Sequence, residues 1–309
     1  MPETFADRLI AAIEVAKAPI CVGIDPMFEM FPEAIAGDAE DRNENDTERV
    51  IDAIYEFTTA VLKVVAEHVP IVKFQSAYFE KYYSDGVEAY YSLVQEAKEL
   101  GLLVIGDVKR GDIGSTASAY AAGHLADPPF EEEEVVTPDA ITVNPMLGLD
   151  TLEPFVQTAK TFGKGLFVLV RTSNPGSADF QDVKLEDGRT WSEMVADRLA
   201  PVAAGMLGSS GFSNVGAVVG ATQPHTMESL RKRLPNSIFL LPGYGAQGAT
   251  AEMTKAAFVK GRGAIVSASR SILYAHREKK YEWIRDWRKA VQRAVIDMKG
   301  DLAKMVGTM

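Results

Sequence analysis

The chain has 309 residues, of which 47% are hydrophobic and 24% charged, with a formal net charge of −11. This size allows one large α/β domain or two ordinary ones, each with a substantial core. The acidic balance argues against nucleic acid and anionic membranes as partners, because phosphate-bearing surfaces favour clustered Lys and Arg. An anionic small ligand would have to be held by local positive groups.

The first residues, MPETFADRLIAAIEVAK, show a helical apolar period but lack the cationic start and long apolar core of a targeting segment. No run in the chain reaches the roughly 18 apolar residues that a membrane span needs. The single cysteine, Cys21, lies in the apolar run PICVGI, which predicts a structural thiol in a reducing compartment. These features predict a soluble, cytoplasmic protein.

Eight short apolar runs recur along the chain and predict strands. They cover residues 19–25, 71–75, 102–109, 140–145, 165–173, 215–222, 238–245 and 263–270. Helical apolar spacing fills the gaps between them, for example at residues 47–69 and 87–100. Eight strand–helix units predict a closed (β/α)8 TIM barrel, with residues 1–309 as one catalytic domain. The alternative is a doubly wound open sheet, but GIDPMF after the first run is no dinucleotide fingerprint.

Three connecting segments exceed the usual length of about two to six residues. Residues 26–46 and 174–189 follow strand ends and should wall a site, whereas residues 124–139 follow a helix and should lie at the opposite rim. The segment 124–139 contains an acidic run at residues 131–134, which predicts that this part is solvated. Residues 279–305 have apolar side chains at helical spacing and predict an extra C-terminal helix that covers the barrel or contacts a partner.

The third apolar run leads into DVKRGDIGST, residues 107–116. Side chains alternate along a strand, so Asp107 and Lys109 should point the same way. Ionised groups at such positions are costly unless they pair or do chemistry. With Asp25 after the first run and Lys73 in the second, charges of alternating sign collect where strands end. We expect the reaction here; the alternative is a structural network of ion pairs.

A second group of residues follows the seventh and eighth runs, in PGYGAQGAT and ASRSIL. TIM barrels commonly bind a phosphate at this point. The glycines let backbone amides approach an anion, and Ser271 lies in a segment that should begin a helix, whose N-terminus favours negative charge. Arg270 can add a forked, charge-assisted contact, and Gln247 can contact both phosphate and substrate.

Together these motifs resemble the orotidine 5′-phosphate decarboxylase family. The similar segments run in order from residue 19 to about residue 272 and are GIDP, IVKFQ, DVKRGDIGST, VRTSNPGS, PGYGAQG and SASRSI. The DxKxxDI pattern with this spacing is specific to that family and its relatives. The RTSNP segment and the long loops are similar to the longer bacterial branch of the family.

The resemblance implies decarboxylation of orotidine 5′-phosphate to uridine 5′-phosphate in pyrimidine biosynthesis, with no cofactor and no metal. It implies that Lys109 donates a proton to C6 of the pyrimidine and that Asp107 lies against the scissile carboxylate. Lys73 would orient Asp107 and bind the ribose. An ammonium that first favours a developing carbanion and then protonates it can serve both purposes.

Further residues are implied to bind the substrate. They are Asp25 for a ribose hydroxyl, Ile113 and Pro242 for the pocket walls, Ser173 for the base edge, and Gln247 and Arg270 for the phosphate. Asp112 and Thr116 match residues that family members lend to the site of the neighbouring subunit. The resemblance therefore implies a homodimer with shared sites.

A metal-dependent sugar-phosphate decarboxylase or aldolase of the same barrel superfamily is the nearest alternative enzyme, because such relatives share DxKxxD. An enediolate needs a divalent cation nearby, yet the second run offers Lys73 where a carboxylate ligand would be expected. The histidines show no ligand spacing; they are His68, His124, His225 and His276.

A barrel that senses a nucleotide without catalysis is an alternative of another class. It would need Arg270 and Gln247 but not Lys109. The sequence by itself assigns no role to Asn144, Arg171 or Asn174, of which the last two lie within two residues of the predicted base-edge residue.

Overall fold

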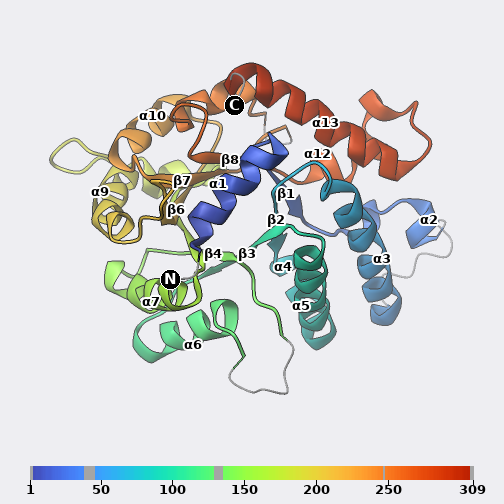
Figure 1. Ribbon diagram of the computed structural model, residues 1–309, viewed down its shortest axis with the longest axis horizontal. Helices are drawn as coiled ribbons and strands as arrows, with labels where there is room; N and C mark the ends of the chain where they lie inside the picture. Colours follow the sequence, from blue (N-terminus) through green and yellow to red (C-terminus); the bar gives the residue numbers. More distant parts are fainter. Residues whose placement is uncertain (1–2, 38–45, 129–134, 246–247, 307–309) are drawn as a thin grey trace.

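The computed structural model describes residues 3–37, 46–128, 135–245 and 248–306. Within them, parallel strands close into a barrel in which each strand pairs with its sequence neighbours and β8 returns to β1 (Figure 1). The strands are β1 Ile20–Ile24, β2 Ile71–Gln75, β3 Leu103–Arg110, β4 Ala140–Val143, β5 Gly165–Arg171, β6 Ser213–Val219, β7 Ser237–Leu241 and β8 Ala264–Ala268. The predicted TIM barrel and its eight strands are confirmed.

Helices surround the strands. They are α1 Phe5–Ala16, α2 Glu33–Ala36, α3 Thr47–Val65, α4 Ala77–Glu80, α5 Tyr83–Glu99, α6 Gly114–Leu125, α7 Glu153–Phe162, α8 Ala178–Gln181, α9 Trp191–Ala204, α10 Pro224–Arg233, α11 Ala251–Thr254, α12 Arg270–Leu273 and α13 Trp287–Val306. The helix predicted over residues 47–69 ends at Val65 instead. A turn follows this end, in which the N–H groups of His68 and Val69 both donate to the carbonyl of Val65, and Pro70 then leads into β2.

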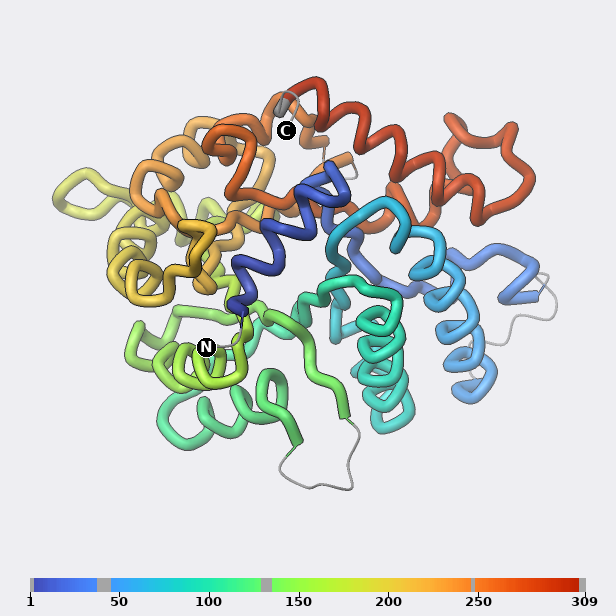
Figure 2. The backbone as a smooth tube through the Cα atoms, viewed as in Figure 1, coloured from blue at the N-terminus to red at the C-terminus, as the bar shows by residue number. Residues whose placement is uncertain are grey.

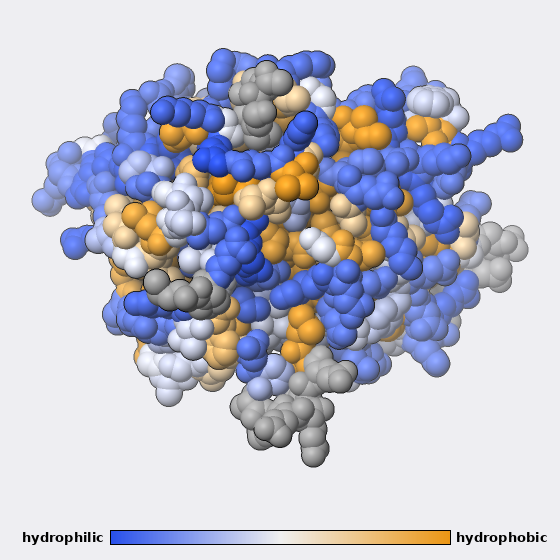
Figure 3. All heavy atoms as spheres, viewed as in Figure 1, coloured by the Kyte–Doolittle hydropathy of each residue, from blue (hydrophilic) through white to orange (hydrophobic). Residues whose placement is uncertain are grey.

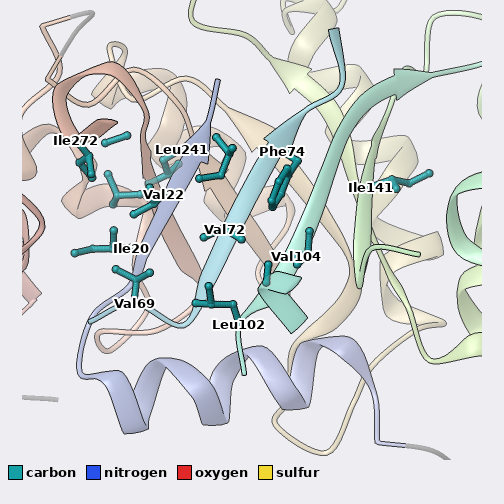
Figure 4. Packing of buried hydrophobic residues seen from close by; sticks show 14 of the residues in the cluster. Ile20, Val22, Val69, Val72, Phe74, Leu102, Val104, Ile141, Leu241 and Ile272 are labelled. Atoms are coloured by element: carbon teal, nitrogen blue, oxygen red, sulfur yellow. The ribbon is translucent and has the colours of Figure 1, made fainter. Parts of the chain in front are cut away.

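Strand side chains alternate between two buried layers. Ile20, Val22 and Val72 belong to the layer between strands and helices (Figure 4). Cys21 and Ile71 belong to the barrel interior, where they pack with Phe5 and Phe167. Because both faces are buried, the strands read as continuous apolar runs in the sequence. Cys21 is a free, fully buried thiol, and burial raises its pKa to about 12.

The helix α1 closes the N-terminal end of the barrel. Its Phe5 packs edge-on against Phe167 inside the barrel, with ring centroids 6.0 Å apart, and a side chain at Gly165 would clash with Phe5. Arg8 donates to the buried carboxylate of Asp139 at 2.7 Å, which ties α1 to β4. Figure 2 shows this N-terminal helix lying across the barrel. Access to the interior is therefore left to the opposite end, where the strands terminate.

The predicted C-terminal helix is present, but α13 begins at Trp287, after a short 3₁₀ turn at Lys279–Tyr281. Its Trp287 stacks on Phe57 of α3, with ring centroids 5.2 Å apart, so α13 covers the outside of the barrel as expected. Hydrophilic residues dominate the face seen in Figure 3, with apolar patches between them. None of the helices in the described ranges has the length and apolar character that crossing a membrane requires.

The long connecting segments lie as predicted relative to the strands. Residues 26–46 follow β1 and contain α2, and residues 174–189 follow β5 and contain α8, so both begin at the C-terminal end of the barrel. Of the segment 124–139, the described residue Asp139 lies just before β4 at the end that α1 closes. The acidic run at 131–134 lies outside the described residues.

Candidate active site

A cavity of about 200 Å³ opens where the strands end. Five of the predicted site residues line it, and these are Asp25, Lys73, Asp107, Pro242 and Arg270. The other lining residues are Gln75, Gly243, Tyr244, Ser267, Ala268 and Ser269. The structure thus brings together the end of β1, the end of β3 and the segments after β7 and β8, as the sequence predicted.

Lys73, Asp107 and Lys109 form a continuous chain of charges. The Nζ atoms of Lys73 and Lys109 each lie 2.6 Å from a carboxylate oxygen of Asp107, one on each oxygen. Lys109 Nζ also lies 3.4 Å from Gln75 Oε1, which places the ammonium beside the cavity. Charge-assisted contacts of this length hold the three side chains in a defined arrangement.

The ionisation of this chain follows from its burial and charges. Burial would raise the pKa of Asp107, but the charges of Lys73 and Lys109 outweigh burial and hold that pKa well below its usual range. Burial would likewise lower the pKa of Lys73, but the charges of Asp107 and Asp25 raise it above its usual value. Asp107 therefore stays ionised and Lys73 stays protonated at neutral pH.

The backbone at Lys109 departs from a regular strand. Its φ of 46° lies in the left-handed region, and the register between β3 and β4 shifts between Gly106 and Arg110. A non-glycine residue in this region costs roughly 1–2 kcal/mol. The predicted meeting of Asp107 and Lys109 is confirmed, but it occurs on a bulged strand end and not through simple alternation. Such irregularities often reorient a side chain next to an active site.

Thr142 of β4 is a site residue that the sequence analysis missed. Its hydroxyl donates to Asp107 Oδ1 at 2.8 Å and accepts from the backbone N–H of Lys109 at 3.0 Å. It therefore fixes both the carboxylate and the irregular backbone. Ser76, also missed, donates to the carbonyl oxygen of Asp107 at 3.4 Å. The available signal was a hydroxyl residue inside or just after an apolar run on the strands flanking β3.

Asp25 is held differently from the sequence expectation. No ion pair of its carboxylate occurs within the described ranges, and its buried Oδ1 has no hydrogen-bond partner there. Its backbone carbonyl accepts from the Tyr274 hydroxyl at 2.8 Å, and that hydroxyl accepts from Met27 N–H at 2.7 Å. The predicted charges of alternating sign do collect at this end of the barrel, but the ion pairs of the described residues join Lys73, Asp107 and Lys109 and do not extend to Asp25. A fixed backbone with a free carboxylate oxygen in the cavity suits a ligand hydroxyl.

Some of the residues at the predicted phosphate-binding end of the cavity line it. Arg270 is exposed and lines the cavity together with Pro242, as expected. The helix α12, Arg270–Leu273, is a single turn, so the helix-dipole contribution expected near Ser271 is small. Gly245 has a φ of 70°, a conformation that glycine adopts without strain. Gln247 lies outside the described residues.

The remaining predicted residues do not line the cavity. Asp112 accepts from the backbone N–H of Ile113 at 2.8 Å, and Ile113 and Thr116 are exposed around the start of α6. Ser173 lies just after β5, beside Gly220. The two residues predicted to serve a second subunit therefore lie outside the cavity of this chain, Asp112 partly exposed and Thr116 exposed.

The donor set of the cavity favours anionic and hydroxyl ligands over a metal ion. Its carboxylates, Asp25 and Asp107, share the space with the Lys73 ammonium, which repels cations. Among the residues that the structure describes, no cluster of three or more His, Cys, Asp or Glu side chains is placed to ligate a metal. The arrangement instead provides fixed charges and, among the described residues, an unpartnered carboxylate oxygen of Asp25 around a small opening.

Comparisons with known proteins agree with this geometry. The family model "Orotidine 5′-phosphate decarboxylase / HUMPS family" matches residues 18–283. A protein named orotidine 5′-phosphate decarboxylase from Rhodopirellula baltica is 40% identical over 305 residues, covering 97% of this chain and 99% of its own length. One of the same name from Caldicellulosiruptor bescii is 41% identical over 277 residues, covering 88% and 90%.

A solved structure of a protein with this name has a similar fold. The OMP decarboxylase of Leishmania donovani superimposes with a TM-score of 0.72 at 27% identity, covering 97% of this chain and 99% of its own. The family model spans every strand of the barrel and the DVKRGDIGST segment with its lysine–aspartate chain. The chain belongs to the orotidine 5′-phosphate decarboxylase / HUMPS family.

Proposed function

We propose that this chain converts orotidine 5′-phosphate to uridine 5′-phosphate and carbon dioxide, the decarboxylation step of pyrimidine biosynthesis, by the action of its own side chains. The observation that carries the proposal is the chain Lys73–Asp107–Lys109, with both ammonium–carboxylate distances at 2.6 Å beside the cavity. Relatives at about 40% identity over most of their length carry the name of this activity.

The reaction needs stabilisation of a localised carbanion. The bond from C6 to the carboxylate carbon breaks, carbon dioxide leaves, and the electron pair stays on C6, which is not conjugated to a carbonyl sink. The Lys109 ammonium favours this developing charge and then transfers a proton from Nζ to C6, forming the new C–H bond. Solvent reprotonates the amine after product release. Asp107 holds Lys109 in place and lies against the substrate carboxylate.

The remaining residues bind the parts of the substrate that do not react. Lys73 and Asp25, which share the cavity, are assigned to the ribose hydroxyls. Arg270 and Gln247 are assigned to the phosphate, Ser173 to the polar edge of the base, and Ile113 and Pro242 to the pocket walls. Binding energy from the phosphate and ribose can be used to lower the barrier at C6, so these residues contribute to turnover as well as affinity.

A homodimer with shared sites is part of the proposal. Ile113, Met146 and Leu147 are more than half exposed, with exposures of 63%, 65% and 56%. They follow the neighbouring strands β3 and β4, so their apolar side chains gather on one part of the rim. Asp112 and Thr116 lie in the same region, at the start of α6, and are assigned to the site of a second copy. Burying these side chains against a symmetric partner removes apolar surface from water.

Mixing two inactive variants tests the shared site. Lys109→Ala and Asp112→Ala chains, each impaired alone, should regain activity after subunit exchange. Random exchange makes half of the dimers hybrid, and each hybrid has one of two sites intact, so about a quarter of wild-type activity should return. Confirmed hybrid dimers without recovered activity would contradict sharing across the interface.

We also propose that residues 1–309 form one cytoplasmic catalytic domain. Packing at both ends of the chain supports this, because α1 closes the barrel through Phe5 and α13 stacks on α3 through Trp287. The buried free thiol of Cys21 suits a reducing compartment.

The family also contains sugar-phosphate enzymes, and a substrate comparison separates the two activities. Purified chain should release uridine 5′-phosphate from orotidine 5′-phosphate, as measured by chromatography. It should leave hexulose 6-phosphate and ketogulonate phosphate unchanged, with or without Mg²⁺, because Lys73 stands in the cavity where an enediolate would need a cation. Turnover of a sugar phosphate without turnover of the nucleotide would overturn the proposal.

A further inference from the structure

Arg171, the last residue of β5, is a buried guanidinium with a dense set of contacts. It is 3% exposed, and its Nε and Nη2 donate to the two carboxylate oxygens of Asp182, both at 2.8 Å. Its Nη1 donates to the carbonyl of Thr172 at 2.5 Å and to the hydroxyl of Ser177. Three segments of the connection after β5 therefore converge on one side chain.

A second set of hydrogen bonds closes the same connection around Thr172. Gln181 accepts from the backbone N–H of Thr172 at 2.7 Å, and the hydroxyl of Thr172 donates to Asn174 Oδ1 at 2.7 Å. Ser192, at the start of α9, donates to the carbonyl of Gln181 at 2.6 Å. Both neighbours of Ser173, Thr172 and Asn174, are thus tied to the segment that Arg171 anchors.

The strand β6 constrains Ser173 from the other side. The backbone N–H of Gly220 donates to the carbonyl of Arg171 at 2.7 Å. A Cβ atom at Gly220 would lie only 3.0 Å from the Cα of Ser173, so the close approach depends on glycine. Ser173 is therefore held between the end of β6 and the network around Arg171.

We propose that Arg171 is a positioning residue for recognition of the base: through its bidentate pair with Asp182 it fixes the backbone of residues 172–174 so that Ser173 meets the polar edge of the pyrimidine. This inference rests on the role of Ser173 in the proposed function. Burying a guanidinium is costly, and an apolar side chain would fill the space at lower cost if packing alone were required. A lysine cannot replace it, since one ammonium cannot form the planar two-bond contact with Asp182.

Arg231 offers a matched control at the other end of the barrel. It is also buried, and its donors contact backbone carbonyls, including those of Ser237 and Gly263 at 2.7 Å each, next to the beginnings of β7 and β8. Burial lowers its pKa to about 9. It shares the burial of Arg171 but has no connection to the candidate site.

The test is a double-mutant cycle between Arg171→Met and Ser173→Ala. Each single variant should lower kcat/KM for orotidine 5′-phosphate by about tenfold, the effect of one lost hydrogen bond, and the double variant should lose no more than the larger single loss. Affinity for uridine 5′-phosphate should fall in parallel, while affinity for ribose 5-phosphate, which has no base, stays unchanged. Arg171→Lys should restore little of the kcat/KM that Arg171→Met loses. Arg231→Met should lower Tm without changing kcat/KM.

Additive losses in the cycle, or an equal loss of ribose 5-phosphate affinity, would overturn the inference. Unchanged kinetics in Ser173→Ala would overturn it as well while leaving the Lys109 chemistry intact. If Arg171→Met does not fold, Asp182→Asn provides the same cycle, because it removes the negative charge and one of the two acceptor oxygens of the bidentate pair at a partly exposed position. If the wild-type chain does not decarboxylate orotidine 5′-phosphate, the proposed function fails. The role of Arg171 is then decided by the affinities of the variants for uridine 5′-phosphate and for ribose 5-phosphate.

Discussion

Replacing Lys109 by alanine is expected to lower kcat for orotidine 5′-phosphate by about 10⁴-fold or more, because one ammonium supplies both the proton and the charge that stabilises the carbanion. Its side chain is 45% exposed, so the substitution should leave the fold intact. Asp107 keeps its contacts with Lys73 and Thr142 in the variant. Steady-state kinetics measure the loss, and circular dichroism checks the fold.

Two comparisons make this result specific. Affinity for uridine 5′-phosphate should change by less than about tenfold, since the product has no carboxylate and no developing charge at C6. Lys232→Ala removes a lysine whose side chain is 74% exposed on α10 and should behave as wild type. Turnover of Lys109→Ala within tenfold of wild type would remove Lys109 from the chemistry.

Replacing Arg270 by alanine is expected to lower kcat/KM by roughly 10- to 100-fold, the range for one charge-assisted contact to a phosphate. Arg270 is exposed, so the loss should not come from unfolding. The effect should disappear with orotidine, which has no phosphate, because wild type and variant then lack the same contact. Arg293→Ala, on α13, is the matched control for loss of an exposed arginine. An equal loss with orotidine would contradict the phosphate assignment.

The barrel could be predicted because its strands are buried on both faces and stand out as apolar runs. The chain of Lys73, Asp107 and Lys109 could be predicted because charged residues interrupt two apolar runs that are consecutive in the sequence, and consecutive strands of a barrel pair as neighbours. Element ends were less predictable: α3 stops before Pro70, and α13 begins at Trp287, since packing and local turns decide these points.

The parts of the site that the sequence did not predict depend on contacts between segments far apart in the chain. Thr142 looks like any threonine in a strand until β4 pairs with β3 and places its hydroxyl on Asp107. The left-handed backbone at position 109 belongs to a lysine and not to a glycine, so the residue type does not indicate it. Arg171 acquires its role only when the connection after β5 folds back to bring Asp182 against it.

The central claim is that fixed side-chain charges, without a metal ion, carry the decarboxylation. Its most direct test is the initial rate of carbon dioxide and uridine 5′-phosphate formation from orotidine 5′-phosphate after exhaustive dialysis against EDTA, before and after addition of Mg²⁺, Mn²⁺ or Zn²⁺. The account predicts equal amounts of the two products at a rate that neither chelation nor added metal changes. Loss of turnover on chelation, with recovery on adding a divalent metal, would contradict it.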